Sequence, residues 1–363
     1  MKEKSKGPNR TTLGIAVLVI LAVGVFLLRG RIHFDWGTFV NQLRLADWKL
    51  FGVGVLLIWG GYVIRAVRWA ALLRPTKRVS GVSLLGTQVI GFTAVALFGR
   101  LADLVRPYLV ARRTNIPLTA QVAVYTVERM FDMGSVALIF ALVLLFAPDR
   151  HTLPHADRIN HTALLALAVV IVFVGFAVFV RAAGKQVAEL MGRSVGSLSP
   201  KLGASVREKI LVFREGLNAI NSFGGFVQAL VLSLVMWMMI AYSYLETLRA
   251  FTASAELAHM TLSRCMLLMA TSTAGSLIQL PIIGWFTQIG IVAKAMQSFF
   301  NVAPEPALGA AAMLLVVTFM SIIPVGLVWS RFEHVSLKKL TEESETAAET
   351  LDQPVKPEFV PEA

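Results

Sequence analysis

Two hydrophobic stretches of this chain are interrupted in the same way, one in each half. The first, residues 84–113, contains the polar break GRLADLVRP at residues 99–107, and the second, residues 267–300, contains PIIGWFTQ at residues 281–288. Irregular backbone at membrane depth is tolerated only where protein or a water-filled cavity covers it. Paired interruptions in corresponding parts of two halves point to a transporter-type binding site. We therefore expect the two breaks to line a site.

Composition places the chain among all-α polytopic membrane proteins. Of its 363 residues, 56% are hydrophobic and 15% are charged, and the mean hydropathy is +0.68. The formal charge of +12 is explained by Lys and Arg in cytoplasmic loops beside anionic lipid, so no nucleic-acid partner is expected. The single cysteine, Cys265, excludes an intrachain disulfide and a thiolate metal site.

Six stretches are apolar and long enough to cross a bilayer: residues 13–28, 50–73, 118–147, 162–180, 226–248 and 308–329. Arg29-Gly30-Arg31 follows the first stretch where a signal peptide would have small residues, so we expect an uncleaved span. Basic residues before the first span, after the second, in the loop 181–214 and after the last span predict cytoplasmic termini. The polar, acidic segment 341–363 predicts a disordered cytoplasmic tail after a membrane domain of residues 1–340.

This orientation decides how the interrupted stretches run. Residues 84–113 must enter and leave from the cytoplasmic side, and residues 267–300 from the outside. Each half, about 13–147 and 162–330, then holds three full spans and one re-entrant hairpin, which together form an inverted repeat. Weak internal similarity agrees, since Gly99 aligns with Gly284 and Asn115 falls near Asn301.

The densest polar cluster lies in the first break. On a helix, Arg100, Asp103 and Arg106 would share one face at a spacing of three. A carboxylate between two guanidiniums would hold them in place, while their remaining donors could fork onto a phosphate. The alternative is an anchor at a helix end, which is the preferred interpretation for Arg112 and Arg113.

Charges inside spans form a second group. Glu128, Arg129 and Asp132 lie within the third span, where a charge costs about 3 kcal/mol or more unless it faces the bundle interior and pairs. They form either a structural ion-pair network or part of an anion or proton path. At the end of the second span, Arg65 and Arg68 either bind lipid phosphate or snorkel to the surface, and we expect Trp69 at the interface.

The remaining candidates are neutral or weak. In the second hairpin, Gln279, Thr287 and Gln288 offer hydrogen bonds rather than charge. Pro154 lies between His151 and His155, so no metal site is expected. Nucleotide-binding, nucleophile-elbow and zinc-protease motifs are missing, so we expect neither a cofactor nor an enzyme. Residues 201–214 predict an amphipathic helix on the inner leaflet.

Several motifs together resemble the lysylphosphatidylglycerol synthase transmembrane, or flippase-like, family. They are GRLADLVRPYL at residues 99–109, VERMFD at 127–132, RAVRW at 65–69 and LPIIG at 280–284. The resemblance covers roughly residues 13–331. The family includes the membrane half of the multiple peptide resistance factor, which moves aminoacylated phosphatidylglycerol between leaflets. It therefore implies lipid translocation. The aminoacyl-transferase domain of the family's enzymes is not present, and Asp103 and Gln288 stand where the family usually has Glu.

The sequence thus predicts a flippase or lipid transporter of the bacterial inner membrane, acting on a phospholipid or a polyprenyl-phosphate lipid. The alternatives are a small-solute secondary transporter and a non-transporting membrane partner of a separate lipid-modifying enzyme. The predicted substrate-binding residues are Arg65, Arg68, Arg100, Asp103, Arg106, Glu128, Arg129, Asp132, Gly284 and Gln288.

Overall fold

The computed structural model describes residues 34–153, 156–197, 199–217, 223–275 and 283–349, and these residues form helices without strands. In chain order the elements are α2 (Trp36–Arg44), α3 (Trp48–Leu73), η1 (Val82–Leu84), α4 (Leu85–Phe98), η2 (Gly99–Ala102), α5 (Val105–Thr114), α6 (Leu118–Leu145), η3 (Arg150–Thr152), α7 (Ala156–Gly196), α8 (Pro200–Leu217), α9 (Phe223–Arg249), α10 (Ala255–Ala258), α11 (Leu262–Gly275), α12 (Ile283–Phe300), α13 (Pro304–Leu315), η4 (Val316–Met320), α14 (Ile322–Phe332) and α15 (Leu337–Glu349). The all-helical class predicted from composition is confirmed for this part of the chain.

Three of the described helical segments are long and apolar enough to cross a membrane: Trp48–Leu73, Phe223–Arg249 and Pro304–Phe332. They coincide with three of the six predicted spans. Helices α6 and α7 cover two more, and their crossing of the membrane stays a prediction. The expected span 13–28 lies outside the described residues.

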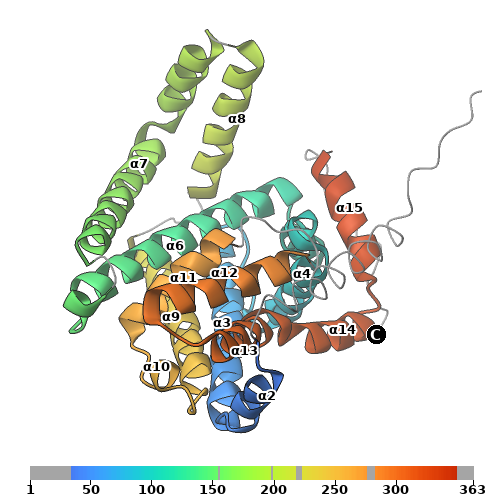
Figure 1. Ribbon diagram of the computed structural model, residues 1–363. Coiled ribbons are helices and arrows are strands. Elements are labelled where there is room, and N and C mark those ends of the chain that lie inside the picture. Colours follow the sequence, from blue (N-terminus) through green and yellow to red (C-terminus); the bar gives the residue numbers. More distant parts are fainter. Residues whose placement is uncertain (1–33, 154–155, 198, 218–222, 276–282, 350–363) are drawn as a thin grey trace, which may run out of the picture.

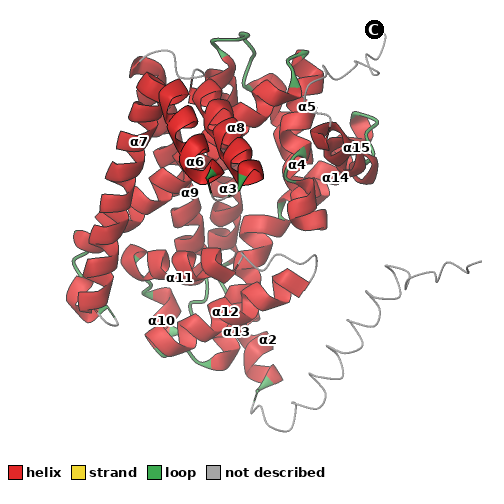
Figure 2. Cartoon of the chain, turned by 90° about the horizontal axis from the view of Figure 1, so that it is seen from above, coloured by secondary structure: helices red, strands yellow, loops and turns green. Residues whose placement is uncertain are grey.

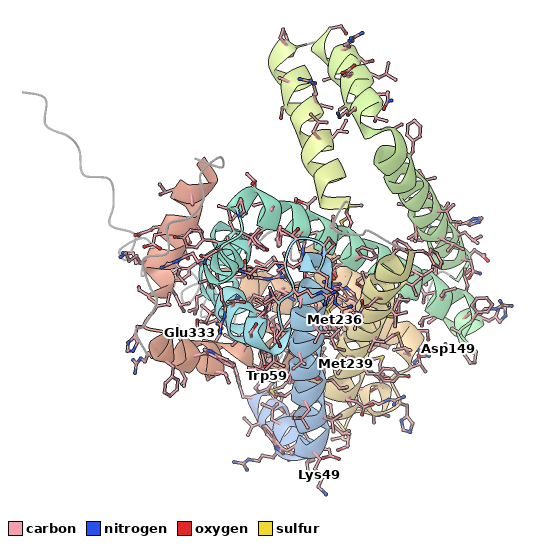
Figure 3. All side chains as sticks on the ribbon, turned by 180° about the vertical axis from the view of Figure 1, so that it is seen from behind. Lys49, Trp59, Asp149, Met236, Met239 and Glu333 are labelled. Carbon is pink, nitrogen blue, oxygen red and sulfur yellow. The ribbon has the colours of Figure 1, made fainter. Side chains whose placement is uncertain are left out.

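Helices α3 and α9 pack side by side in the centre of the bundle (Figure 1). Small residues allow this approach: a Cβ on Gly54 would lie 2.9 Å from Thr247 Oγ1. Met236 and Met239 of α9 lie against α3 (Figure 3), and Met239 Cε occupies the space beside Gly60. Without a hydrophobic force between helices in lipid, such close contact is what holds membrane helices together.

The first predicted break is present in the backbone. Helix α4 ends at Gly99, whose φ of 69° and ψ of −147° suit glycine. A short 3₁₀ turn follows, and α5 begins at Val105. Because the α-helix is not continuous through this segment, the spacing-of-three argument that placed Arg100, Asp103 and Arg106 on one face does not hold.

Both interrupted segments end in the same local structure. Asn115 after α5 and Asn301 after α12 adopt left-handed conformations, with φ of 53° and 55°. Pro117 then precedes α6, and Pro304 begins α13. Asparagine tolerates this conformation and proline suits the first turn of a helix. The agreement supports the internal repeat suggested by the sequence, although residues 276–282 between α11 and α12 lie outside the described part.

The expected loop 181–214 is helical in the structure. Helix α7 continues to Gly196 past one non-helical residue, Ala183 (φ −126°, ψ 25°), and α8 contains the expected amphipathic helix. The two helices form a hairpin that projects from the bundle (Figure 1), and Figure 2 looks down on this hairpin from above. They approach closely where a Cβ on Gly203 would lie 2.5 Å from the carbonyl oxygen of Gly192.

The predicted disorder of the tail is wrong for residues 341–349, which belong to α15. Leu337, Leu340, Thr341 and Ser344 are buried, and their spacing forms one stripe on the helix. Leu337 and Leu340 pack in a cluster with Ala102, Val105 and Tyr108 of the first hairpin. The short stripe is easily missed in a sequence rich in Glu and Thr, because it becomes apolar surface only when a partner is beside it. Residues 350–363 lie outside the described part.

Candidate functional site

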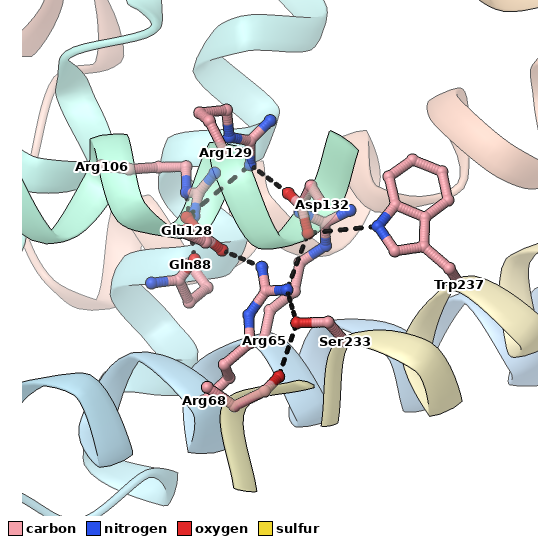
Figure 4. Close-up of polar contacts among 10 residues, drawn as sticks. Arg65, Arg68, Gln88, Arg106, Glu128, Arg129, Asp132, Ser233 and Trp237 are labelled. Atoms are coloured by element: carbon pink, nitrogen blue, oxygen red, sulfur yellow. Dashed lines mark hydrogen bonds and ion pairs between the residues drawn. The ribbon is translucent and has the colours of Figure 1, made fainter. Parts of the chain in front are cut away.

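A buried cluster of charges lies where α3, α5 and α6 meet (Figure 4). Arg65 and Arg68 lie one turn apart on α3, and Glu128 and Asp132 one turn apart on α6. Arg68 and Glu128 are fully buried, and Arg65 and Asp132 are 8% and 4% exposed. The two helices therefore face each other with complementary charges.

Arg68 joins the two carboxylates. Its Nη1 donates to Asp132 Oδ1 at 2.7 Å and to Ser233 Oγ of α9 at 2.6 Å, and its Nη2 donates to Glu128 Oε1 at 2.8 Å. Complete burial contradicts the snorkelling interpretation of Arg68. The interfacial interpretation of Trp69 is also wrong, since Trp69 is fully buried and its Nε1 donates to Gln121 Oε1 at 3.0 Å.

Arg106 enters the same cluster from α5. Its Nη2 forms an ion pair with Glu128 Oε2, and its Nε donates to Gln88 Oε1 at 3.0 Å. The guanidinium carbon lies 4.3 Å from the ring centroid of Phe92 and 5.0 Å from that of Trp69. A Cβ on Gly91 would overlap Arg106 Cγ, so this glycine makes room for the arginine stem.

The structure divides the predicted site residues into a buried group and a group that lines an open space. The buried group is joined by ion pairs and consists of Arg68, Arg106, Glu128 and Asp132. The second group consists of Arg65, Arg129, Gly284 and Gln288, and Asp103 contributes electrostatically at Arg129. The Arg100 side chain lies outside the description. Arg106 points into the buried cluster, whereas Arg129 lines an open space.

That space is a cavity of about 340 Å³ between the two hairpins. Its lining from the first hairpin includes Gly99 and Phe92, and its lining from the second includes Gly284, Trp285 and Gln288. The other lining side chains that the argument uses are Arg65, Arg129, Trp237, Tyr244, Ser272 and Thr318. Residues 283–288 of the second predicted break are helical, as the start of α12, and residues from both predicted breaks line one cavity.

Arg65 and Arg129 belong both to the charged cluster and to the cavity lining. Arg129 Nη2 lies 3.1 Å from Asp132 Oδ2, and Arg65 Nη1 lies 3.5 Å from the same oxygen. The Arg129 side chain is 39% exposed. Arg65 Nη1 and Arg129 Nε and Nη2 make no hydrogen bond within the described residues.

Positive charge exceeds negative charge in this part of the molecule. The guanidiniums of Arg65, Arg68, Arg106 and Arg129 face the carboxylates of Glu128 and Asp132, an excess of two, or of one when Asp103 is added. Buried charge without a counterion is expensive. Because Arg65 and Arg129 line the cavity, the excess suits an anionic group there.

Sequence reasoning missed several lining residues. Tyr244, Ser272 and Thr318 lie outside the breaks and carry no motif. Thr318 belongs to η4, a π-helical turn at Val316–Met320 within the last apolar helix. Such turns often occur at functional sites, but nothing in a uniformly apolar stretch predicts one.

Comparison with known families decides the classification. The profile of the lysylphosphatidylglycerol synthase TM region matches residues 13–326. The chain belongs to this family. A curated relative, Glycosyltransferase AglD of Haloferax volcanii, is 29% identical over 131 residues, which is 36% of this chain and 20% of the relative. The chain thus spans about a fifth of that relative's length. No solved structure matches.

Membership of the lysylphosphatidylglycerol synthase TM region family confirms the resemblance seen in the motifs. All ten predicted site residues lie within the matched region. The protein is therefore a membrane protein associated with lipid. In the described part of the chain, no group of three His, Cys, Asp or Glu side chains could hold a metal ion.

Proposed function

We propose that this chain is a transporter of the bacterial inner membrane that moves a lipid bearing an anionic phosphate group between leaflets. The observation that carries the proposal is the cavity between the two hairpins, whose lining includes Arg65 and Arg129 of a cluster in which guanidiniums outnumber carboxylates. The headgroup would pass through this cavity while the acyl chains stay in the bilayer. Arg65 and Arg129 form the binding layer, and Arg68, Arg106, Glu128 and Asp132 form a bracing layer behind it.

Guanidinium chemistry favours this substrate. Arginine binds phosphate through paired, charge-assisted hydrogen bonds and stays protonated at physiological pH. Arg129 is held at the cavity by Asp132 and lies 5.2 Å from the ring centroid of Tyr125. These contacts fix its direction before the ligand arrives, so little conformational entropy remains to be lost on binding.

The bracing layer explains how the charges stay buried. Arg68 and Arg106 share Glu128, and Arg68 also reaches Asp132. Glu128 is thereby paired mainly with arginines behind the cavity wall, while Asp132 also pairs with Arg65 and Arg129 at the cavity. A phosphate in the cavity would supply the missing negative charge beside these two arginines.

Leaflet exchange of labelled phosphatidylglycerol in proteoliposomes tests the proposal. Arg129→Gln should slow exchange by about tenfold or more, because a hydrogen bond to a charged group contributes about 1.5–3 kcal/mol. Arg129→Lys should recover part of the rate, since lysine keeps the charge but loses the planar fork.

The matched control is Arg113→Gln, which removes a guanidinium from α5 at an exposed pair with Glu333. It should exchange lipid at the parent rate. If Arg129→Gln exchanges lipid as fast as the parent while retaining its stability, Arg129 does not bind the lipid and the proposal fails.

A second candidate is a membrane partner for a separate lipid-modifying enzyme. The projecting α7–α8 hairpin favours it, as does the relative whose name is that of a glycosyltransferase. Reversing the exposed charges at Lys185 and Arg193 on α7 distinguishes the two candidates. A transporter should keep its rate of leaflet exchange, whereas a recruiting protein should lose its effect on lipid modification in cells.

A further inference from the structure

We infer that the cavity selects a phosphate lipid whose headgroup is neutral and hydroxylated, such as glycerol or a sugar, and that Gln288 helps to exclude cationic headgroups. This inference rests on the proposed function and names its substrate class. It follows from the different chemistry of the two sides of the cavity.

One side of the cavity carries charge and the other carries only neutral polar groups. Arg65 of α3 and Arg129 of α6 form the charged side. Tyr244 of α9, Ser272 of α11 and Gln288 of α12 supply hydroxyl and amide groups. A ligand that satisfies both sides has an anion at one end and neutral hydrogen-bonding groups at the other.

The described lining of the cavity offers no carboxylate to a cationic headgroup. None lines the cavity within the described residues, and the sequence has neither Asp nor Glu anywhere from residue 262 to residue 300. In residues 82–114 the acidic residue is Asp103, which does not belong to the cavity lining. An ammonium group would therefore meet the excess positive charge of the arginines without a counterion.

The neutral side is suited to hydroxyl groups. Gln288 Nε2 donates to Ser272 Oγ at 2.9 Å, and Ser272 Oγ lies 3.3 Å from the hydroxyl of Tyr244. In this chain of contacts Gln288 Oε1 accepts no hydrogen bond from described residues, so it can accept one from a ligand hydroxyl. Trp285 adds aromatic surface for the C–H faces of glycerol or a sugar.

Gln288 is the position at which a single change should reverse the preference. A glutamate there would place a carboxylate on the neutral side, where it would oppose an anionic lipid and attract an ammonium group. The side chain would keep its size and its acceptor oxygen but lose the amide donor to Ser272.

The experiment measures binding of four lipids to the purified full-length chain by native mass spectrometry: phosphatidylglycerol, phosphatidylinositol, phosphatidic acid and lysylphosphatidylglycerol. Phosphatidylglycerol and phosphatidylinositol should bind about tenfold or more tightly than lysylphosphatidylglycerol, and phosphatidic acid should lie between them. A comparison of the first two separates a glycerol from a sugar headgroup. Competition with soluble glycerol 1-phosphate separates recognition of the headgroup from recognition of the whole lipid.

Gln288→Glu should weaken phosphatidylglycerol binding by about tenfold and strengthen binding of the lysylated lipid. Gln297→Glu is the matched control, because it makes the same change on the same helix away from the cavity lining, and it should leave the preference unchanged. If the parent binds lysylphosphatidylglycerol as tightly as phosphatidylglycerol, or if Gln288→Glu leaves the ratio unchanged, the inference is overturned while lipid transport can stand. If no lipid exchanges between leaflets, the proposed function falls and the inference falls with it.

Discussion

Glu128 is the carboxylate on which the buried cluster most depends. Its two oxygens pair with Arg68 and Arg106, which are 0% and 2% exposed. Glu128→Gln would leave Arg106 with Gln88 and aromatic rings in place of a carboxylate, and would raise the excess of positive charge by one. Breaking a buried ion pair from one side costs about 3–5 kcal/mol, and we expect a loss of about 4 kcal/mol because two guanidiniums share this partner.

Removal of the opposing charge should offset part of this loss. Arg106→Met alone should cost about 3 kcal/mol, since Glu128 keeps Arg68 at 2.8 Å and breaking a buried pair is expensive. In the double variant no unpaired guanidinium remains at this position. The combined loss should then be about 4–5 kcal/mol, which gives a coupling energy of about 2–3 kcal/mol.

The assay is reversible unfolding by sodium dodecyl sulfate in mixed micelles, followed by tryptophan fluorescence, with free energies compared at one detergent composition. Arg113 and Glu333 provide the control cycle, because they pair at 3.2 Å with side chains 43% and 28% exposed. An exposed pair of this kind should couple by less than about 1 kcal/mol. A coupling between Glu128 and Arg106 below about 0.5 kcal/mol would refute the reasoning, since it would show that the two charges do not depend on each other.

Three further outcomes are expected. Truncation after Ser336 should lower the free energy of unfolding by about 1–3 kcal/mol, because it removes α15 with its buried Leu337 and Leu340, and truncation after Glu349 should cost less in the same assay. Gly91→Ala should lower the free energy of unfolding by about 1–3 kcal/mol, because its Cβ would overlap Arg106. Gly134→Ala has open space around it and should leave the free energy of unfolding unchanged or raise it. In a Cys265→Ser background, a cysteine at Asn115 should react with a membrane-impermeant thiol reagent from the cytoplasm and one at Thr152 from outside. Labelling of Asn115 from outside would contradict a first hairpin that re-enters from the cytoplasm.

The sequence by itself determined the class of protein and the places where its helices break. Long apolar runs leave a chain no stable state except helices in a bilayer or a buried bundle, so α3, α9 and the segment from α13 to α14 were predictable. Gly99 could be read as a break because glycine adopts backbone angles that end a helix, and its angles in the structure agree. The recurrence of asparagine before proline at the end of each interrupted segment was also visible, because both residues act through local geometry.

Only the tertiary structure decided which charges face the cavity. Spacing along a helix tells which side chains share a face, but it does not tell which neighbour that face meets. Arg106 follows a break in the helix, so its direction could not be extrapolated from Arg100 and Asp103. Packing turned it towards Glu128 and left Arg129 at the cavity.

The same limit explains the other differences. The stripe of α15 becomes a buried face only because Ala102, Val105 and Tyr108 of the first hairpin lie beside it. The π-helical turn that places Thr318 at the cavity has no signal in an apolar run. Local geometry is encoded in neighbouring residues and can be read from them, whereas burial and pairing depend on residues distant in the chain, whose arrangement exists only once the helices have packed.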